Sequence, residues 1–408
     1  MKLNGKYRML HSCLGLICSS AFGYNAFFLA EYGFDASETG MIIALFNVLT
    51  ALSLPVFGRI ADRSRRFHWK NMLLIFAGAG VLIWGALLFC SQKLLVGILF
   101  QTGGLLISCM YPMTNIICFF YAKRGLNIDY GIARGLNSLF YAVGAYVLGQ
   151  LTVRMGGSVI IWMGLLICAV ILWPVLRMPY LKTPEREEER KRAAEEIQTE
   201  KISGKRKKEE KFWKKYPSFS VLVLGSVLHM TVFSLTGTFL IRLIEEVGGD
   251  SSNLGIALAI CAAAEVPVLM LFSQIVKRIS ETKLMIFAGV MFSVKSLILL
   301  LAGNVGMIYV AQLLQPFAYA LFASASVYFS DRCMEEEDEV TGQSLLSMSG
   351  SVGSVIGSLV GGWLVENSGV RMSMLAGLLT AILTTAVIGI AVKMYHKECR
   401  LKQSLEQI

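Results

Sequence analysis

The segment DASETG, residues 35–40, recurs later in the chain as DSSNLG, residues 250–255, so the pattern D-x-S-x-x-G occurs twice. Each copy follows one long apolar stretch and precedes another. Beyond the next stretch, IFAG at residues 75–78 is matched by IFAG at residues 286–289. Prolines inside the stretches correspond in the same way: Pro55 with Pro267, and Pro112 with Pro316. Matches that keep their order and spacing indicate an internally duplicated chain.

The composition indicates that the chain folds in lipid. Its 408 residues are 55% hydrophobic and 16% charged, with a mean hydropathy of +0.60, whereas a soluble protein carries about 25% charged residues. About twelve apolar segments are long enough to cross a hydrocarbon layer of about 30 Å as helices. They lie near residues 8–32, 38–61, 70–91, 94–122, 131–153, 157–178, 217–244, 253–276, 283–303, 305–330, 341–365 and 371–394. The sequence therefore predicts an all-α polytopic membrane protein with two pseudo-symmetric six-helix bundles, an architecture typical of alternating-access transporters.

A segment rich in charges of both signs divides the two predicted bundles. It cannot bury enough apolar surface to fold alone, and a solvated linker is favoured over a basic patch for anionic lipid headgroups. The expected organisation is an N-terminal bundle at 1–180, a cytoplasmic linker at 181–216, a C-terminal bundle at 217–396 and a cytoplasmic tail at 397–408.

The formal net charge of +10 is distributed as in a membrane protein. Lysines and arginines are concentrated in alternate loops. By the positive-inside rule, both termini then lie in the cytoplasm, and we expect a multi-pass protein of the cell membrane. This distribution argues against a nucleic-acid partner. The nine cysteines show no metal-ligand spacing, so we expect neither a metal site nor a cofactor.

Few ionisable residues lie well inside the predicted spans. Glu265 stands in the apolar run AICAAAEVPVLMLF, residues 259–272, and the others are Lys295, His229 and Arg134. A lone ionised acid in hydrocarbon costs several kcal/mol, so Glu265 and Lys295 are candidates for one paired site. The alternative is a structural ion pair that locks two helices together.

Polar side chains form stripes on the helices around these charges. Arg134, Asn137, Ser138 and Tyr141 follow the i, i+3, i+4, i+7 spacing of one helical face, and Gln312, Gln315 and Tyr319 form a similar face. Such groups in lipid spans need polar partners, which a solute in a wet cavity supplies, although a single amide is more often a contact between helices. The candidate substrate-binding residues are Asn25, Asn115, Arg134, Asn137, Ser138, Tyr141, Glu265, Gln312, Gln315 and Tyr319.

The loop GRIADRSRR, residues 58–66, follows the second predicted helix. It resembles the signature loop of the major facilitator superfamily, G-x-x-x-D-[RK]-x-G-[RK]-[RK], through Gly58, Ala61, Asp62, Arg63 and Arg66, with Arg65 at the usual glycine position. The resemblance implies the major facilitator fold. Asp62 can hold a helix end or a cation in one conformation, so Gly58, Asp62, Arg63 and Arg66 are predicted to form a conformational latch. An ordinary positive-inside loop would explain the arginines but not Asp62 with Gly58.

A narrower resemblance is carried by DYGIARGLNSLFYAVG, AAAEVPV, FSVKSLI, QLLQPF and GSLVGGWLVENSG, which are similar to the lactose-permease-like branch of oligosaccharide/proton symporters. It implies that Arg134 and Glu265 bind sugar hydroxyls, that Tyr141 stacks on the sugar, and that Lys295 serves the proton step. The chain departs from the branch at Asn115, which replaces an acid, and at Gln312 and Gln315, which replace a histidine and a glutamate. These amides do not titrate, so the proton-coupling candidates are Glu265, Lys295 and His229.

These features predict a secondary active transporter, acting as a monomer, that moves a sugar, an oligosaccharide or a nucleoside-like solute by alternating access with proton symport. Its expected partners are that solute, protons and the lipid bilayer. The alternatives are a proton-driven exporter of drugs or amphipathic metabolites, an organic-anion transporter, a uniporter, or a sensor that no longer transports. An enzyme is not expected, because the sequence contains no H-E-x-x-H, no phosphate-binding loop and no nucleophile with a base.

Overall fold

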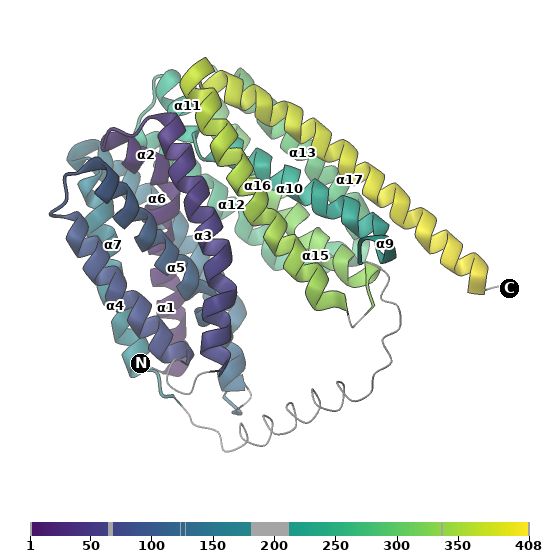
Figure 1. Cartoon of the computed structure of the whole chain (residues 1–408), viewed down its shortest axis with the longest axis horizontal. Helices are drawn as coiled ribbons and strands as arrows, with labels where there is room; N and C mark the ends of the chain where they lie inside the picture. The colour runs from purple at the N-terminus through teal and green to yellow at the C-terminus, as the bar shows by residue number, and fades with distance from the viewer. Residues whose placement is uncertain are drawn as a thin grey trace.

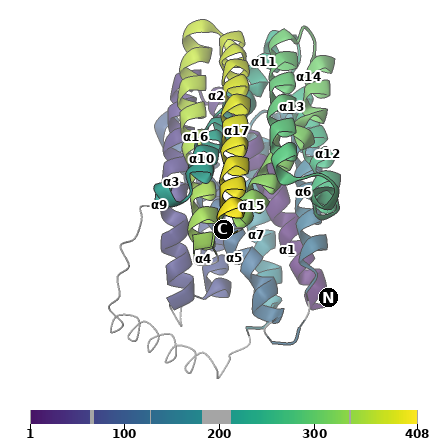
Figure 2. The ribbon, with the colours of Figure 1, turned by 90° about the vertical axis from the view of Figure 1, so that its right-hand side faces the viewer.

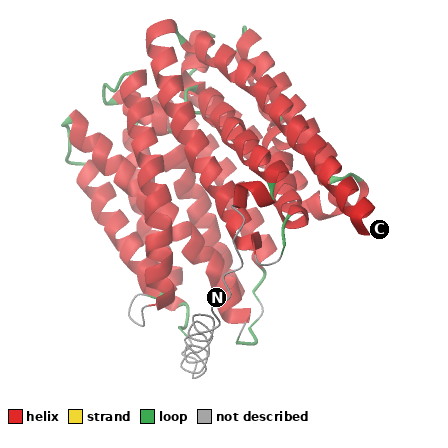
Figure 3. Ribbon diagram, turned by 45° about the vertical axis from the view of Figure 1, so that its right-hand side comes forward, coloured by secondary structure: helices red, strands yellow, loops and turns green. Residues whose placement is uncertain are grey.

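The computed structural model describes residues 2–63, 68–122, 124–126, 128–180, 212–335 and 338–406, and its regular structure there is helical (Figure 3). In these ranges eleven helices are long and apolar enough to cross a membrane. A twelfth span arises when Leu3–Gly23 and Asn25–Glu31, which meet at a bend of 52°, are counted as one. The predicted fold of about twelve membrane-spanning helices is therefore confirmed.

Six of these spans, from the bent pair at the start of the chain to Ser158–Arg177, form the N-terminal bundle, whose position is shown in Figure 1. The first is bent and consists of three pieces, and each of the other five is one helix. The elements are α1 (Leu3–Cys18), the π-helix η1 (Ser19–Gly23), α2 (Asn25–Glu31), α3 (Ala36–Arg63), α4 (Trp69–Leu87), α5 (Lys93–Ala122), α6 (Tyr130–Met155) and α7 (Ser158–Arg177).

The second bundle repeats this arrangement: its first span is again built from shorter pieces, and here the fourth span is too. Its elements are α9 (Phe212–Lys215), α10 (Pro217–Gly237), α11 (Leu240–Glu246), α12 (Ser251–Arg278), α13 (Glu281–Leu301), α14 (Val305–Leu313), the π-helix η2 (Pro316–Ala320), α15 (Leu321–Cys333), α16 (Glu339–Ser368) and α17 (Val370–Glu406). The helices of both bundles run lengthwise side by side (Figure 2). Residues 397–406, expected to form a tail, continue α17 without a break.

The repeated D-x-S-x-x-G pattern starts the second span of each bundle. Asp250 accepts hydrogen bonds from the backbone of Asn253, whose side chain accepts one from the backbone of Asp250, so the two residues form a capping box. Asp35 and Glu38 exchange the same two bonds at the start of α3. The same atoms therefore satisfy the exposed N–H groups at both helix starts, which is a structural sign of the duplication.

Positive backbone angles also repeat between the halves. Gly33 and Gly248 follow the first span of each bundle with φ of 80° and 84°, and Gly156 and Gly369 follow the fifth with φ of 65° and 83°. Residues with a Cβ rarely adopt this conformation. The tight turns that follow the first and fifth spans therefore occur at equivalent places in both halves.

The bundles contact each other at the end remote from the linker, here called the far end; the opposite end is the linker end. At the far end α6 packs on α12 and α3 packs on α16. A Cβ at Gly255 would lie 2.5 Å from the Ala145 carbonyl oxygen and 3.0 Å from the Cα of Gly149. Gly40 and Gly362 approach each other in the same way in the other pair. Only glycine permits backbones to cross this closely.

Hydrogen bonds and the apolar core reinforce the far-end contact. Tyr24 donates towards the carbonyls of Ala145 and Ser251, at 2.9 and 3.2 Å, and thereby joins α6 to α12. One core cluster runs continuously from the N-terminal bundle into α11 and the start of α12. A separate cluster around Phe219 and Phe329 fills the linker end of the second bundle. The bundles accordingly diverge towards the linker end (Figure 1).

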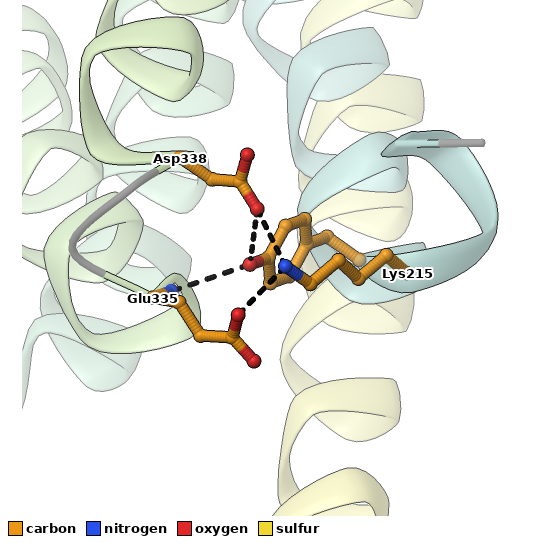
Figure 4. A network of polar contacts seen from close by, with 4 residues as sticks. Lys215, Glu335 and Asp338 are labelled. Atoms are coloured by element: carbon orange, nitrogen blue, oxygen red, sulfur yellow. Dashed lines mark hydrogen bonds and ion pairs between the residues drawn. The ribbon is translucent and has the colours of Figure 1, made fainter. Parts of the chain in front are cut away.

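A polar network ties α9 to the loop before α16 at the linker end (Figure 4). The ammonium of Lys215 lies 2.7 Å from a carboxylate oxygen of both Glu335 and Asp338. The Tyr216 hydroxyl donates to Asp338 at 2.8 Å and accepts from the Glu335 backbone at 3.3 Å. The start of the second bundle is thus fastened to the loop between its fourth and fifth spans.

Candidate functional site

Polar side chains of the two bundles converge midway between the far end and the linker end. Arg134 and Tyr141 of α6 and Glu265 of α12 are half-buried, and both α6 residues lie close enough to Glu265 to interact electrostatically with it. Tyr319 of η2 is half-buried and interacts with both Glu265 and Arg134. The predicted face of α6 therefore meets the predicted acid of α12.

Two π-helical turns adjoin this convergence. Tyr319 belongs to η2, which begins at Pro316, a residue that cannot donate a backbone hydrogen bond. In the first span, η1 ends at Gly23, where a Cβ would lie 3.0 Å from the Tyr141 hydroxyl. Single π turns inside helices are common at functional sites, because they shift the direction of the following side chains.

Lys295 does not form the direct ion pair with Glu265 that the sequence suggested. Its buried ammonium donates to the side-chain oxygen of Gln312 at 3.3 Å and to that of Gln315. Gln315 is also the hydrogen-bonding neighbour of Glu265. An amide can accept from the cation and donate to the carboxylate at once, so Gln315 mediates the interaction between the two charges.

Asn137 is the central hydrogen-bonding residue of the α6 stripe. Its side-chain oxygen accepts from the Tyr111 hydroxyl at 2.6 Å and from Arg134 at 3.3 Å, while its nitrogen donates to the His11 carbonyl at 3.0 Å. Only 4% of Asn137 is exposed. Arg134 also donates to Ser138 at 3.2 Å. Asn137 therefore positions Arg134 and joins α6 to α1.

Tyr111 of α5 is a site residue that the sequence reasoning missed. Its ring lies 5.8 Å from the guanidinium of Arg134, and its hydroxyl holds Asn137. The available signal was its spacing four residues before Asn115, which places both on one face of α5. Asn115 is half-buried, and in the described part of the chain its side-chain oxygen has no hydrogen-bonding partner.

Two further predicted residues are buried, and one of them, His229, lies 6.4 Å from the ring of Tyr319. Asn25 is buried and accepts a hydrogen bond from Gln101 at 3.1 Å, a contact between α2 and α5. His229 is fully buried, with its ring stacked 4.0 Å from Phe322 and edge-on to Phe292 at 4.7 Å. Neither ring nitrogen of His229 has a hydrogen-bonding partner among the described residues.

The predicted latch falls largely outside the described residues. The backbone of Gly58, Asp62 and Arg63 belongs to the end of α3, but their side chains and the whole of Arg66 are not described. Within the described ranges, no group of three histidine, cysteine or acidic side chains could hold a metal ion.

The paired bundles, the far-end glycine crossings and the shared polar centre are the architecture of a secondary transporter. The chain belongs to the major facilitator superfamily, because residues 2–376 match the family described as MFS_1 like family.

Sequence relatives and solved structures agree with this assignment. A putative sugar efflux transporter of Deinococcus radiodurans is 25% identical over 372 residues, covering 88% of this chain and 90% of the relative. A maltose permease of Geobacillus stearothermophilus is 22% identical over 343 residues, covering 82% and 81%. Among solved structures, the nucleoside transporter NupG (D323A mutant) superposes with a TM-score of 0.79 at 12% identity, covering 96% of this chain and all of that one. The POT family transporter PepTSo gives a TM-score of 0.69 at 12% identity, covering 97% and 99%.

Proposed function

We propose that this transporter carries a small, polar, hydroxyl-rich solute, namely a sugar, an oligosaccharide or a nucleoside-like molecule, together with a proton. The single observation that carries the proposal is the meeting of Arg134 and Tyr141 from one bundle with Glu265 and Tyr319 from the other. A guanidinium and a carboxylate form charge-assisted hydrogen bonds with hydroxyl groups, and aromatic rings pack on sugar or base faces. A solute bound by both bundles favours their closure around it.

The charge balance of the site favours a neutral solute over an organic anion. By sequence, two cations face one acid, which would suit an anionic solute. Lys295, however, is buried and already donates to Gln312 and Gln315, so its charge is engaged inside the second bundle. The charged groups left to bind a solute are then Arg134 and Glu265, whose opposite charges nearly cancel.

Glu265 is the proton carrier in this proposal, with Lys295 setting the surrounding field. The glutamines at 312 and 315 cannot hold or release a proton at physiological pH. A solute that engages Arg134 weakens the attraction between Arg134 and the Glu265 carboxylate, which favours uptake of a proton by that carboxyl. Lys295 remains in place because two amides hold it.

Export is the second candidate for the direction of transport. The matched protein of Deinococcus radiodurans is named a putative sugar efflux transporter, whereas the matched protein of Geobacillus stearothermophilus is named a permease. Both directions use the same central site, so the direction follows from the driving gradients and not from the site residues.

A thermal-shift screen of purified protein against sugars, nucleosides and organic anions, followed by transport assays, tests the proposal. We expect stabilisation by a sugar or nucleoside and solute-driven proton uptake that is lost in Glu265→Gln. Solute movement without any proton movement would reject the coupling. Stabilisation only by organic anions or hydrophobic cations would reject the solute class.

A further inference from the structure

His11 is a second buried histidine, in the first span of the N-terminal bundle. It is fully buried, and in the described part of the chain neither ring nitrogen has a hydrogen-bonding partner. A buried polar group without a partner is costly, so an imidazole kept in this state calls for a functional explanation. The close contact of Gly15 with the Asn137 backbone, one turn further along α1, holds His11 against α6.

Titratable groups surround His11 on the side of the linker end. The Tyr7 ring lies 4.7 Å from the His11 ring and the Tyr130 ring 6.1 Å from it. Tyr130 is 38% exposed, and Arg8 lies 3.7 Å from Asp129 in an ion pair whose side chains are about two-fifths exposed. Tyr130 thus connects the surface at the linker end with the buried imidazole by a ring contact, whereas the buried Tyr7 hydroxyl, like the His11 nitrogens, has no hydrogen-bonding partner among the described residues.

His11 is also linked to the proposed site, because Asn137 donates to its backbone carbonyl and accepts from Arg134. Arg134 lies close enough to interact electrostatically with both His11 and Glu265. From α5, the Cys118 thiol lies next to Tyr7. The buried side chains of α7 are apolar apart from Cys168, which lies against Gly80 of α4. His11 is therefore placed between Arg134 and the surface cluster of Arg8, Asp129 and Tyr130.

We propose that His11 relays protons between Glu265 and the aqueous phase at the linker end, which rests on the proton symport proposed above. The neutral imidazole accepts the proton that leaves Glu265 on one nitrogen and releases the proton of its other nitrogen to water of the aqueous phase at the linker end. The ring returns neutral as the other tautomer, one proton has moved, and no electron is transferred. A ring that returns neutral after each transfer passes protons without storing them.

His229, the buried histidine of the other bundle, provides the comparison. Its ring contacts Phe322 and Phe292, which neither donate nor accept protons, and lies 6.4 Å from the Tyr319 ring, with Lys295 close by. Tyr319 is half-buried, whereas Tyr130 beside His11 is 38% exposed, so of these two histidines only His11 has a tyrosine neighbour that reaches the surface at the linker end. The proposal therefore assigns the relay to His11 and not to His229. The amides at 312 and 315 cannot themselves relay a proton in the second bundle.

The first test uses full-length protein in proteoliposomes, with maltose and uridine as probe solutes. His11→Gln is expected to lower solute-driven proton movement by about tenfold or more, whereas exchange of labelled probe at equal pH continues, because exchange needs no net proton release. Tyr7→Phe shows whether the neighbouring hydroxyl takes part. Loss of coupling in His229→Gln with none in His11→Gln would overturn the assignment. If no proton accompanies either probe in the unaltered protein although both are exchanged, the proposed symport itself fails.

A second measurement needs no solute. In protein labelled with ¹⁵N-histidine, the ring N–H of His11 is expected to exchange with water faster than that of His229, with each signal assigned from the corresponding glutamine variant. Exchange of His11 as slow as that of His229 would exclude a relay. A destabilised variant would be recognised by a lowered unfolding temperature, and His11→Asn then replaces it as the smaller amide.

Discussion

At the residue scale, the side chains of the central stripe have two distinct tasks. The spacing of Arg134, Asn137, Ser138 and Tyr141 correctly predicted one face of α6. The spacing alone could not distinguish a side chain that contacts the other bundle from one that holds its neighbours on α6 in place. Arg134 and Tyr141 interact with Glu265, whereas Asn137 uses its side chain for hydrogen bonds to Tyr111, Arg134 and the His11 backbone. Tyr111 and His11 lie on other helices, so the spacing of residues along α6 does not reveal them as partners of Asn137.

Replacing Asn137 by alanine is expected to destabilise the protein by about 1–3 kcal/mol, because buried polar partners are left unsatisfied. Ser138→Ala, which removes only a half-exposed acceptor for Arg134, should cost much less. Thermal unfolding of the purified variants measures both. Equal unfolding temperatures for the two variants would contradict the positioning role of Asn137.

At the element scale, short polar motifs fix where helices begin and how they are joined. The D-x-S-x-x-G pattern was read from sequence as a sign of duplication, and the structure adds its physical task as a capping box followed by a crossing glycine. The junction of α9 with the loop before α16 was not foreseen. Lys215 and Asp338 are far apart in the chain, and only the tertiary fold brings them together (Figure 4).

This junction should make stability depend on pH at the acid side. The hydrogen bond from Lys215 holds the pKa of the Asp338 carboxyl below its usual range, with a second contribution from Tyr216. A carboxyl whose pKa is lower in the folded state contributes stability above its unfolded pKa of about 4 and loses it as the pH falls through the folded value. The pair is exposed to solvent, so the contribution is small.

The unfolding temperature of the unaltered protein should therefore exceed that of Asp338→Asn at pH 7. The difference should shrink as the pH is lowered from 5 towards 3, where the native carboxyl also becomes protonated. The comparison cancels the titration of all other carboxyls. A difference that is constant over this range would show that Asp338 does not act through its charge.

At the scale of the whole molecule, four glycines determine how the bundles meet at the far end. A Cβ at Gly255 would lie 2.5 Å from the Ala145 carbonyl oxygen. This oxygen belongs to the backbone and cannot move aside as the end of a flexible side chain could. Gly255→Ala should therefore disfavour the present arrangement and shift the population towards one with the far end separated. Since each 1.4 kcal/mol is about tenfold in population, a modest clash suffices.

Spin labels at residues 92 and 303, in far-end loops of different bundles, measure this shift as a longer distance in a background without native cysteines. Gly78→Ala is the matched control, because nothing lies within 4 Å of a Cβ there. An unchanged distance distribution in Gly255→Ala would show that the crossing tolerates a methyl group.

The sequence by itself determined the membrane-spanning helices, their number and their duplication. Hydrophobic length and turn chemistry are local properties that lipid enforces segment by segment. Tertiary structure alone decided that Gln315 stands between Glu265 and Lys295, that Asn137 is held by α1 and α5, and that His11 lies close to Arg134. These relations depend on how helices distant in sequence rotate and pack against one another, and no local pattern encodes that rotation.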